Sequence, residues 1–310
     1  MITGIRDSTA DLVFRELHSR GIPAVRLDPA VDLPSTMARL ESSFQPDGYD
    51  GRIETETRSI ALSDVAAVYW RRPTPWPNPA EGTREAFTVG QCWAASSGIL
   101  ASLDNALYVN HPSANYAAEF KRAQLAAAWK AGLTVPPTLI TTNAREASEF
   151  VARHTPAIYK PLWNLPVQDD EGCRSVWVRK VAAGELDDSV AGCPHLFQAA
   201  VRKVADVRLA VVGDHMIATR LESEHLDWRE DYNALIRRPI SVPEPVREAV
   251  KRYMAAFGLI YGAFDFSLTG DGEWVFLECN PNGQWAFVDE ESVAGITTEF
   301  GNLFEAAVSR

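Results

Sequence analysis

The chain has 310 residues, of which 46% are hydrophobic and 23% charged, and its formal net charge is −11. This length and composition fit a globular protein with a substantial core, and the acidic balance argues against a nucleic-acid partner, since phosphate binding needs clustered Lys and Arg. No apolar run approaches the roughly 20 residues that cross a bilayer, and charges stand where a signal peptide would be apolar. Four cysteines at 92, 173, 193 and 279 show no metal-ligand spacing, which favours free thiols in a reducing cytoplasm.

The first part of the chain predicts alternating strands and helices. Residues 1–30 suggest a strand, a helix that Gly21 ends, and a second strand. A β-rich piece covers 51–62, the apolar run at 65–70 is typical of a buried strand, and a helix spans about 82–104. A long Ala-rich helix then starts at Asn115 and stops at Gly132.

The remaining residues predict an antiparallel α+β region. Helices are expected at about 144–154, at 243–257 and at the C-terminus, with a polar loop at 168–174. Strands are expected at 134–141, 157–162, 175–181, 195–201, 206–213, 215–222, 261–268 and 274–280. The whole therefore reads as α/β (α+β), with a Rossmann-like N-terminal lobe and a larger, mostly antiparallel remainder.

The last two strands predict a hairpin with an unusual polar face. With Asp271-Gly272 as a two-residue turn, Asp265 pairs with Glu278 and Ala263 with Asn280. The other face is apolar and is the predicted core face: it carries Phe264, Phe266, Leu268, Val275, Leu277 and Cys279. Two carboxylates directly opposite each other repel; exposure to water is one way to tolerate this, and a bound Mg²⁺ that offsets the two charges explains the pair better. Mg²⁺ takes carboxylate and amide oxygens together with substrate phosphates, and the small Ala263 leaves room on that face.

Cationic residues on other strands support a phosphate site. Lys160 lies in an otherwise apolar strand, while Lys121 on the Ala-rich helix would by itself be an ordinary surface residue. Arg208 and Arg220 are embedded in apolar strands, where an unpaired guanidinium is costly and phosphate or carboxylate is its natural partner. The sequence contains no GxxxxGK[ST], no GxSxG and no paired histidine spacing, which argues against a P-loop, a hydrolase elbow or a zinc site.

Together these features resemble the ATP-grasp superfamily from about residue 65 to the end. The elements stand in the superfamily's order: a helix Lys before AGLTVPPTLIT, a strand Lys in YKPL, FQAAV followed by Lys203 and DVRLAVVG, Asp265, and FLECNPNGQW. Finer features resemble the ribosomal-peptide maturases that make graspetides (microviridin-type ester and amide crosslinks). These features are YWRRP at 69–73, the stretch from NHPSAN to LTVPPT, DWR at 227–229 and the NPNGQW ending.

The resemblance implies a domain plan and a set of residue roles. It implies a pre-ATP-grasp domain over 1–114, a central subdomain with a lid over 115–196, the lid being the polar loop 168–174, and a C-terminal nucleotide and metal subdomain over 197–310. Lys121 and Lys160 would contact ATP phosphates, the segment from Gln198 through Ala199 to Val201 would form the adenine hinge, and Lys203 and Asp206 would lie near ribose or substrate. Asp265, Glu278 and Asn280 would hold Mg²⁺, Arg208 and Arg220 would face phosphate and the acceptor carboxylate, and Arg72, Asp227 and Arg229 are candidate substrate contacts.

The implied reaction is ATP-dependent activation of a carboxylate as an acyl phosphate, followed by attack of a hydroxyl or amine. In a graspetide maturase both groups belong to one precursor peptide with a leader segment, and the enzyme is expected to be a homodimer without membrane or nucleic-acid partners. The alternatives are an ATP-grasp ligase that joins a free amino acid to a small molecule or protein tail, and a nucleotide-binding regulator without catalysis.

Overall fold

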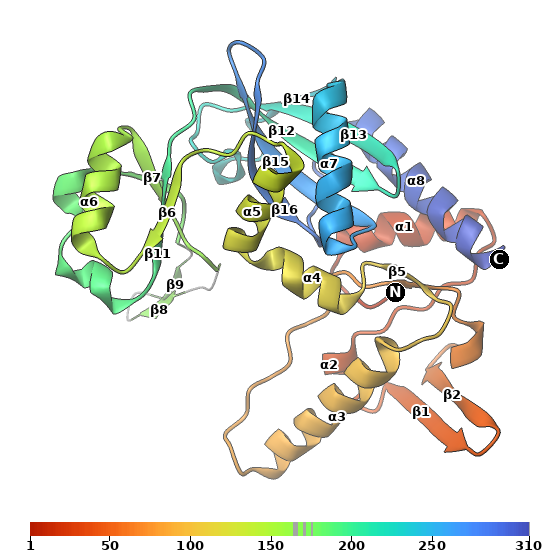
Figure 1. Ribbon diagram of the computed structural model, residues 1–310. Coiled ribbons are helices and arrows are strands. Elements are labelled where there is room, and N and C mark those ends of the chain that lie inside the picture. Colours follow the sequence, from red (N-terminus) through yellow and green to blue (C-terminus); the bar gives the residue numbers. More distant parts are fainter. Residues whose placement is uncertain (164–166, 170–171, 175, 310) are drawn as a thin grey trace.

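The computed structural model describes residues 1–163, 167–169, 172–174 and 176–309. Its three regions are an N-terminal region with a short parallel sheet, a central four-stranded sheet and a C-terminal five-stranded sheet (Figure 1). Both larger sheets are antiparallel, so the expected α/β (α+β) class is confirmed. In the described part of the chain, no helix is long and apolar enough to span a membrane.

The N-terminal region is Rossmann-like in its parallel pairing. Strands β4 and β5 pair in parallel, and Ile2 forms parallel bridges to Leu27 and to Trp70. The two strands expected within residues 1–30 are thus reduced to single bridging residues, and the hairpin β1–β2 was not expected in full. The elements of this region are α1 (Ser8–Ser19), α2 (Pro29–Asp32), β1 (Ala38–Gln45), β2 (Gly48–Thr55), β3 (Ser59–Ala61), η1 (Leu62–Asp64), β4 (Ala67–Tyr69), α3 (Arg84–Leu100) and β5 (Leu107–Val109).

The single Ala-rich helix predicted from Asn115 is wrong, because the chain forms two helices. Helix α4 spans Pro112–Glu119 and α5 spans Lys121–Ala131, with Phe120 in an extended conformation between them. The break leaves the Ala118 carbonyl without its helical donor, and the Gln124 side-chain Nε2 donates to it at 2.7 Å. The break makes Lys121 the first residue of α5.

The central region is a four-stranded sheet of order β10-β7-β11-β6, with α6 packed against it. Its elements are β6 (Thr138–Thr141), α6 (Ala144–Arg153), β7 (Ala157–Lys160), β10 (Arg179–Val181), η2 (Ala183–Glu185), η3 (Asp188–Gly192) and β11 (His195–Ala199). The expected boundary at 196/197 therefore cuts through β11. The expected polar loop at 168–174 contributes instead to a small hairpin of β8 (Val167–Asp169) and β9 (Gly172–Arg174), and residues 170–171 lie outside the described residues.

The C-terminal sheet has the order β14-β13-β12-β15-β16. Helices α5 and α7 cover one of its faces, where Phe264 and Phe276 pack on Tyr253 and on Phe266, and α1 and α8 cover part of the other (Figure 1). β14 was not predicted. The elements are β12 (Lys203–Val212), β13 (His215–Glu222), η4 (Trp228–Glu230), β14 (Ile236–Ile240), α7 (Glu244–Phe257), β15 (Tyr261–Thr269), β16 (Trp274–Asn280) and α8 (Glu290–Val308).

Candidate active site

The hairpin β15–β16 carries the predicted carboxylate pair. Asp265 stands opposite Glu278 and Ala263 opposite Asn280, as the sequence predicts. The turn, however, is not the predicted two-residue turn, because Thr269 pairs with Glu273: its backbone N–H donates to the Glu273 carbonyl at 3.0 Å. Gly270, Asp271 and Gly272 then form a three-residue loop in which Gly272 has a left-handed φ of +89°.

A β-bulge at Leu277 restores the predicted register beyond this turn. Phe266 pairs with Phe276 and Asp265 with Glu278, so Leu277 is the extra residue on β16. Because of the bulge, two of the six residues predicted on the core face are wrong. Trp274 and Phe276 point into the core in place of Val275 and Leu277, and Leu277 lines a cleft instead.

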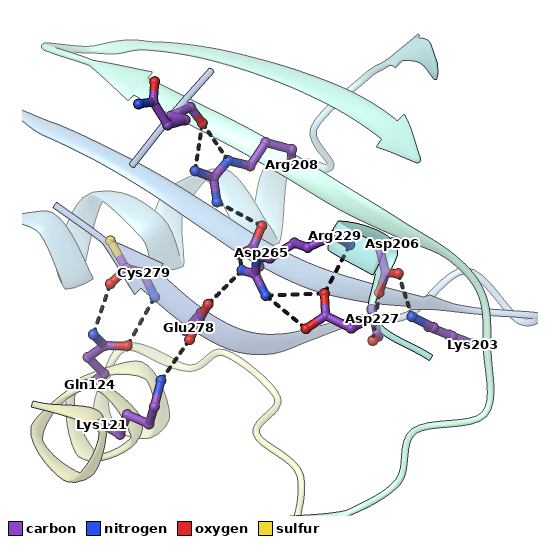
Figure 2. A network of polar contacts seen from close by, with 12 residues as sticks. Lys121, Gln124, Lys203, Asp206, Arg208, Asp227, Arg229, Asp265, Glu278 and Cys279 are labelled. Carbon is purple, nitrogen blue, oxygen red and sulfur yellow. Dashed lines mark hydrogen bonds and ion pairs between the residues drawn. The ribbon is translucent and has the colours of Figure 1, made fainter. Parts of the chain in front are cut away.

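Three cationic side chains neutralise the two carboxylates (Figure 2). Arg229 Nη2 lies 2.6 Å from Asp265 Oδ2 and 2.7 Å from Glu278 Oε1. Arg208 Nη1 binds Asp265 Oδ1, and Lys121 Nζ binds Glu278 Oε2, each at 2.9 Å. Burial raises the pKa of Glu278, but attraction by Lys121 and Arg229 outweighs it and holds the pKa well below the ordinary value. The charge compensation that we expected from a bound Mg²⁺ is thus supplied by the chain's own cations.

The carboxylate pair lies at the floor of a cleft between the central and C-terminal sheets. The cleft has a volume of about 930 Å³, including the part open to solvent. Lys160 at the end of β7 also lines it, and burial lowers the pKa of Lys160 to about 8. The other predicted residues that line it are Lys121, Gln198, Ala199, Val201, Lys203, Asp206, Asp227, Arg229, Asp265 and Glu278.

The end of β11 supplies a second kind of surface to the cleft. Gln198 is 2% exposed, and its Nε2 donates to Thr138 Oγ1 at 2.8 Å. Its Oε1 has no hydrogen-bond partner among the described residues. Such a buried, unsatisfied acceptor costs about 1–3 kcal/mol, and because the atom itself is buried, a donor on a bound ligand would satisfy it after the amide turns toward the cleft. Beside it, Lys203 Nζ binds Asp206 Oδ2 at 2.5 Å and the Leu226 carbonyl at 2.7 Å.

Known proteins match this arrangement along the chain. Residues 1–115 match the family model of the MvdD pre-ATP grasp domain. The structure of the Chryseobacterium gregarium RiPP-associated ATP-grasp ligase, in complex with ADP and a leader and core peptide, superposes with a TM-score of 0.87 at 24% identity, over 97% of this chain and 94% of that one. The chain has the ATP-grasp ligase fold.

Two macrocyclases from Microcystis aeruginosa share this ATP-grasp fold. MdnC, bound with the precursor peptide MdnA, has a TM-score of 0.85 at 23% identity, over 99% of this chain and 98% of that one. MdnB has a TM-score of 0.79 at 27% identity, over 97% of each chain. The ATP-grasp ligase PsnB, solved with a precursor variant, Mg and ADP, has a TM-score of 0.74 at 22% identity over 99% and 96%. No curated protein sequence matches the chain.

Some predicted residues lie outside the cleft of this ATP-grasp fold. Arg220 stands opposite Val207, which belongs to the core, and Arg220 binds Glu222 at 2.9 Å. Since alternate residues of a strand face opposite sides, Arg220 points to the core side of the sheet and away from the cleft. The expectation that Arg220 faces phosphate is therefore not met by this geometry. Arg72 is exposed at the end of β4, and Asn280 is exposed with its Oδ1 accepting from the Asn282 backbone.

Arg208 contacts Asp265 from the protein interior rather than from the cleft surface. It is 5% exposed and, besides Asp265, binds the Gln284 carbonyl through Nε at 3.2 Å and Nη2 at 2.7 Å. Arg71 binds the same turn from the N-terminal region: it donates to the Gly283 carbonyl and to Gln284 Oε1 and pairs with Asp7 at 2.6 Å. Arg71 is 1% exposed, so it fastens the turn rather than facing substrate.

Sequence reasoning missed Gln124, which ties the site's helix to its strand. Its Nε2 donates to the Cys279 carbonyl at 2.9 Å and its Oε1 accepts from the Cys279 N–H at 3.1 Å, so it pairs with β16 as a neighbouring strand would (Figure 2). Lys121 and Glu278 are thereby held together. In the sequence, a Gln three residues after Lys121 is only a weak signal for this contact, because the side chain would be exposed to water if the helix stood alone.

The structure describes the side chains of three of the four cysteines. Cys92, Cys193 and Cys279 are free thiols, as expected, and the Cys173 side chain lies outside the described residues. Among the described residues, no three His, Cys, Asp or Glu side chains are grouped to hold a metal. The predicted metal set of Asp265, Glu278 and Asn280 thus depends on an amide oxygen for its third ligand.

Proposed function

We propose that this protein is an ATP-dependent ligase that activates Asp or Glu side chains of a ribosomally made precursor peptide. It then closes ester or amide crosslinks with Thr, Ser or Lys side chains of the same peptide. The observation that carries the proposal is the Asp265–Glu278 pair, surrounded by Lys121, Arg208 and Arg229 at the floor of the cleft. The similarity to peptide ligases over nearly the whole chain supports the choice of substrate.

The residues of the cleft fit ATP. The orphan Gln198 Oε1 would accept from an amino group on the base, with the backbone of Ala199 to Val201 alongside. Lys121 and Lys160 also line the cleft and would place positive charge at the phosphates. Lys203 and Asp206, which line the cleft as well, would meet the ribose.

The same floor fits a divalent cation. Asp265 and Glu278 would hold it through hard oxygen ligands suited to Mg²⁺, and the Asn280 amide would join them only after its Oδ1 leaves the Asn282 backbone N–H. When bound, Mg²⁺ would neutralise the charge that develops on the phosphate oxygens. The burial of Asp265, which is 3% exposed, and the bonds from Arg208 keep this carboxylate fixed for that role.

The chemistry requires positioning and charge stabilisation rather than a covalent enzyme nucleophile. The acceptor carboxylate of the peptide attacks the γ-phosphate of ATP, which yields an acyl phosphate and ADP. A hydroxyl or amine of the peptide then attacks the acyl carbon, and phosphate leaves. Lys160 and Arg229 supply positive charge at the cleft surface for the transferred phosphoryl group. We further propose that a leader segment docks away from this floor.

The test is the mass of a precursor peptide incubated with the protein, ATP and Mg²⁺. A short peptide encoded beside the gene, with a C-terminal part rich in Thr or Ser and Asp or Glu, should lose the mass of one water per crosslink. The variant Asp265→Asn should lose this activity, and Asp214→Asn in the exposed β12–β13 turn is the matched control that should keep it. An unchanged peptide mass, despite ATP consumption with small acceptors, would favour a ligase for free amino acids instead.

A further inference from the structure

The strongest unexplained feature of the site is the position of Arg229. Asp265 Oδ2 and Glu278 Oε1, one oxygen from each carboxylate, converge on the single nitrogen Nη2 at 2.6 and 2.7 Å. The outer oxygens of the pair are bound by Arg208 and Lys121. Two carboxylate oxygens that converge on one point form the arrangement that a divalent cation requires. Arg229 Nη2 therefore lies at the point where a metal shared by these two oxygens would bind.

Arg229 differs from the other two cations in how its backbone is held. Arg208 stands in the middle of β12 and is fixed by the Gln284 carbonyl, and Lys121 opens helix α5. Arg229 belongs to the three-residue turn η4, and its side chain is 32% exposed. Its guanidinium also lies over the Trp228 ring at 4.9 Å and within 3.4 Å of Asp227. Of these three, Arg229 can leave the carboxylates with the least change to the fold.

The charges around the pair decide what such a departure costs. A metal that enters alone would separate the guanidinium from its two carboxylates within a cleft that also holds Lys121 and Lys160, and like charges there repel. A nucleotide that enters with the metal brings phosphates, which are good partners for a guanidinium fork. Release of Arg229 is therefore costly for a metal alone and favourable for a metal with a nucleotide.

We propose that Arg229 is an exchangeable counter-ion of the metal site, displaced from Asp265 and Glu278 when a divalent cation binds. It prevents repulsion between the carboxylates and makes them bind metal weakly until phosphate is present. The exchange couples metal and nucleotide binding, and by linkage the coupling acts equally in both directions. This inference rests on the proposed function only for the identity of the ligands, Mg²⁺ and ATP.

The experiment measures metal binding without peptide. Mn²⁺, which substitutes for Mg²⁺ and is detected by its paramagnetic resonance when free, is titrated into the full chain with and without ADP. Removing the competing guanidinium in Arg229→Gln should tighten binding of Mn²⁺ alone by about tenfold, the equivalent of one charge-assisted hydrogen bond. The same variant should lose most of the enhancement that ADP gives to Mn²⁺ binding.

Three further variants make the result specific. Arg247→Gln removes an equal charge from α7, where Arg247 is half-buried and, among the described residues, forms an ion pair with Glu244 alone at 3.7 Å, and should bind Mn²⁺ as the wild type does. Adding Asp265→Asn to Arg229→Gln should abolish the gain. Arg229→Lys keeps the charge on a shorter side chain without the planar guanidinium, so it should hold the two carboxylates less well and show a smaller gain, and it serves if Arg229→Gln does not fold.

The proposal is overturned if folded Arg229→Gln, or Arg229→Lys in its place, binds Mn²⁺ no more tightly than the wild type. It is also overturned if the gain survives Asp265→Asn, because the metal would then bind elsewhere. Failure of the peptide-crosslinking test would leave these titrations unaffected, so the two proposals fail separately.

Discussion

Replacement of Gly283 by Ala tests how the turn after β16 supports the site. Gly283 does not have a left-handed φ, so its conformation alone would accept Ala. Packing would not, since a Cβ at this position would lie 2.4 Å from the Ala263 Cβ and 2.5 Å from Arg208 Nη2. The room beside Ala263 that the sequence suggested for a ligand is thus filled by this turn.

The cost follows from what the added methyl group must displace. Overpacking of a rigid interior costs about 1–3 kcal/mol. If Arg208 moves, Asp265 loses a buried ion pair, and breaking such a pair costs about 3–5 kcal/mol. Because the backbone turn can absorb part of the clash, we expect Gly283→Ala to lower the free energy of unfolding by about 3 kcal/mol and to abolish ATP-dependent activity.

Urea denaturation measures the stability, and ADP release with a peptide acceptor measures the activity. The matched control is Gly90→Ala in α3, where an added Cβ meets nothing within 4 Å. This variant should be more stable than the wild type by up to about 1 kcal/mol, because Ala favours a helix over Gly. If Gly283→Ala is as stable and as active as the wild type, Arg208 does not depend on this turn and the account of its packing is wrong.

Three further predictions concern single side chains. Arg71→Met strands the buried Asp7 carboxylate and should lower the free energy of unfolding by about 3–5 kcal/mol, whereas Arg52→Met, whose ion pairs are exposed, should change it by less than about 0.5 kcal/mol. Gln198→Leu removes the orphan acceptor and should weaken ADP binding about tenfold in calorimetry; unchanged affinity would contradict the base contact. Because the pKa of Lys160 is lowered to about 8, its ammonium is lost above that pH. ADP affinity should therefore fall as the pH rises through 8, and Lys160→Arg should remove this dependence.

The local patterns of the chain predicted most of the site because they survive in the fold. Strand alternation placed Asp265 and Glu278 on one face away from Phe264 and Phe266. The predicted turn was wrong by one residue, and the bulge at Leu277 compensated for it. A single sequence contains no signal for such a bulge, because its position depends on which side chains the core and the cleft each accept.

Other differences arise where the environment overrides local preference. Ala-rich sequence favours one long helix, yet the helix is interrupted at Phe120. Gln124 compensates for the interruption by donating hydrogen bonds to the Ala118 carbonyl and to β16. The apolar neighbours of Arg220 suggested a buried phosphate contact, but the register of β13 turns this side chain to the other face. In both cases the deciding partner lies far away in the sequence.

The sequence by itself determined the α/β class, the order of the main elements and the shared face of Asp265 and Glu278, because these depend on periodicity and residue chemistry, while its resemblance to ATP-grasp ligases indicated most of the other residues that line the cleft. Only the tertiary structure decided which charges meet. Arg229 comes from a short turn with no regular pattern, and nothing in its local sequence places it between Asp265 and Glu278. Coulomb attraction in a partly buried cleft selects that position, and it does so only after two sheets and a helix have brought the carboxylates and their cations together.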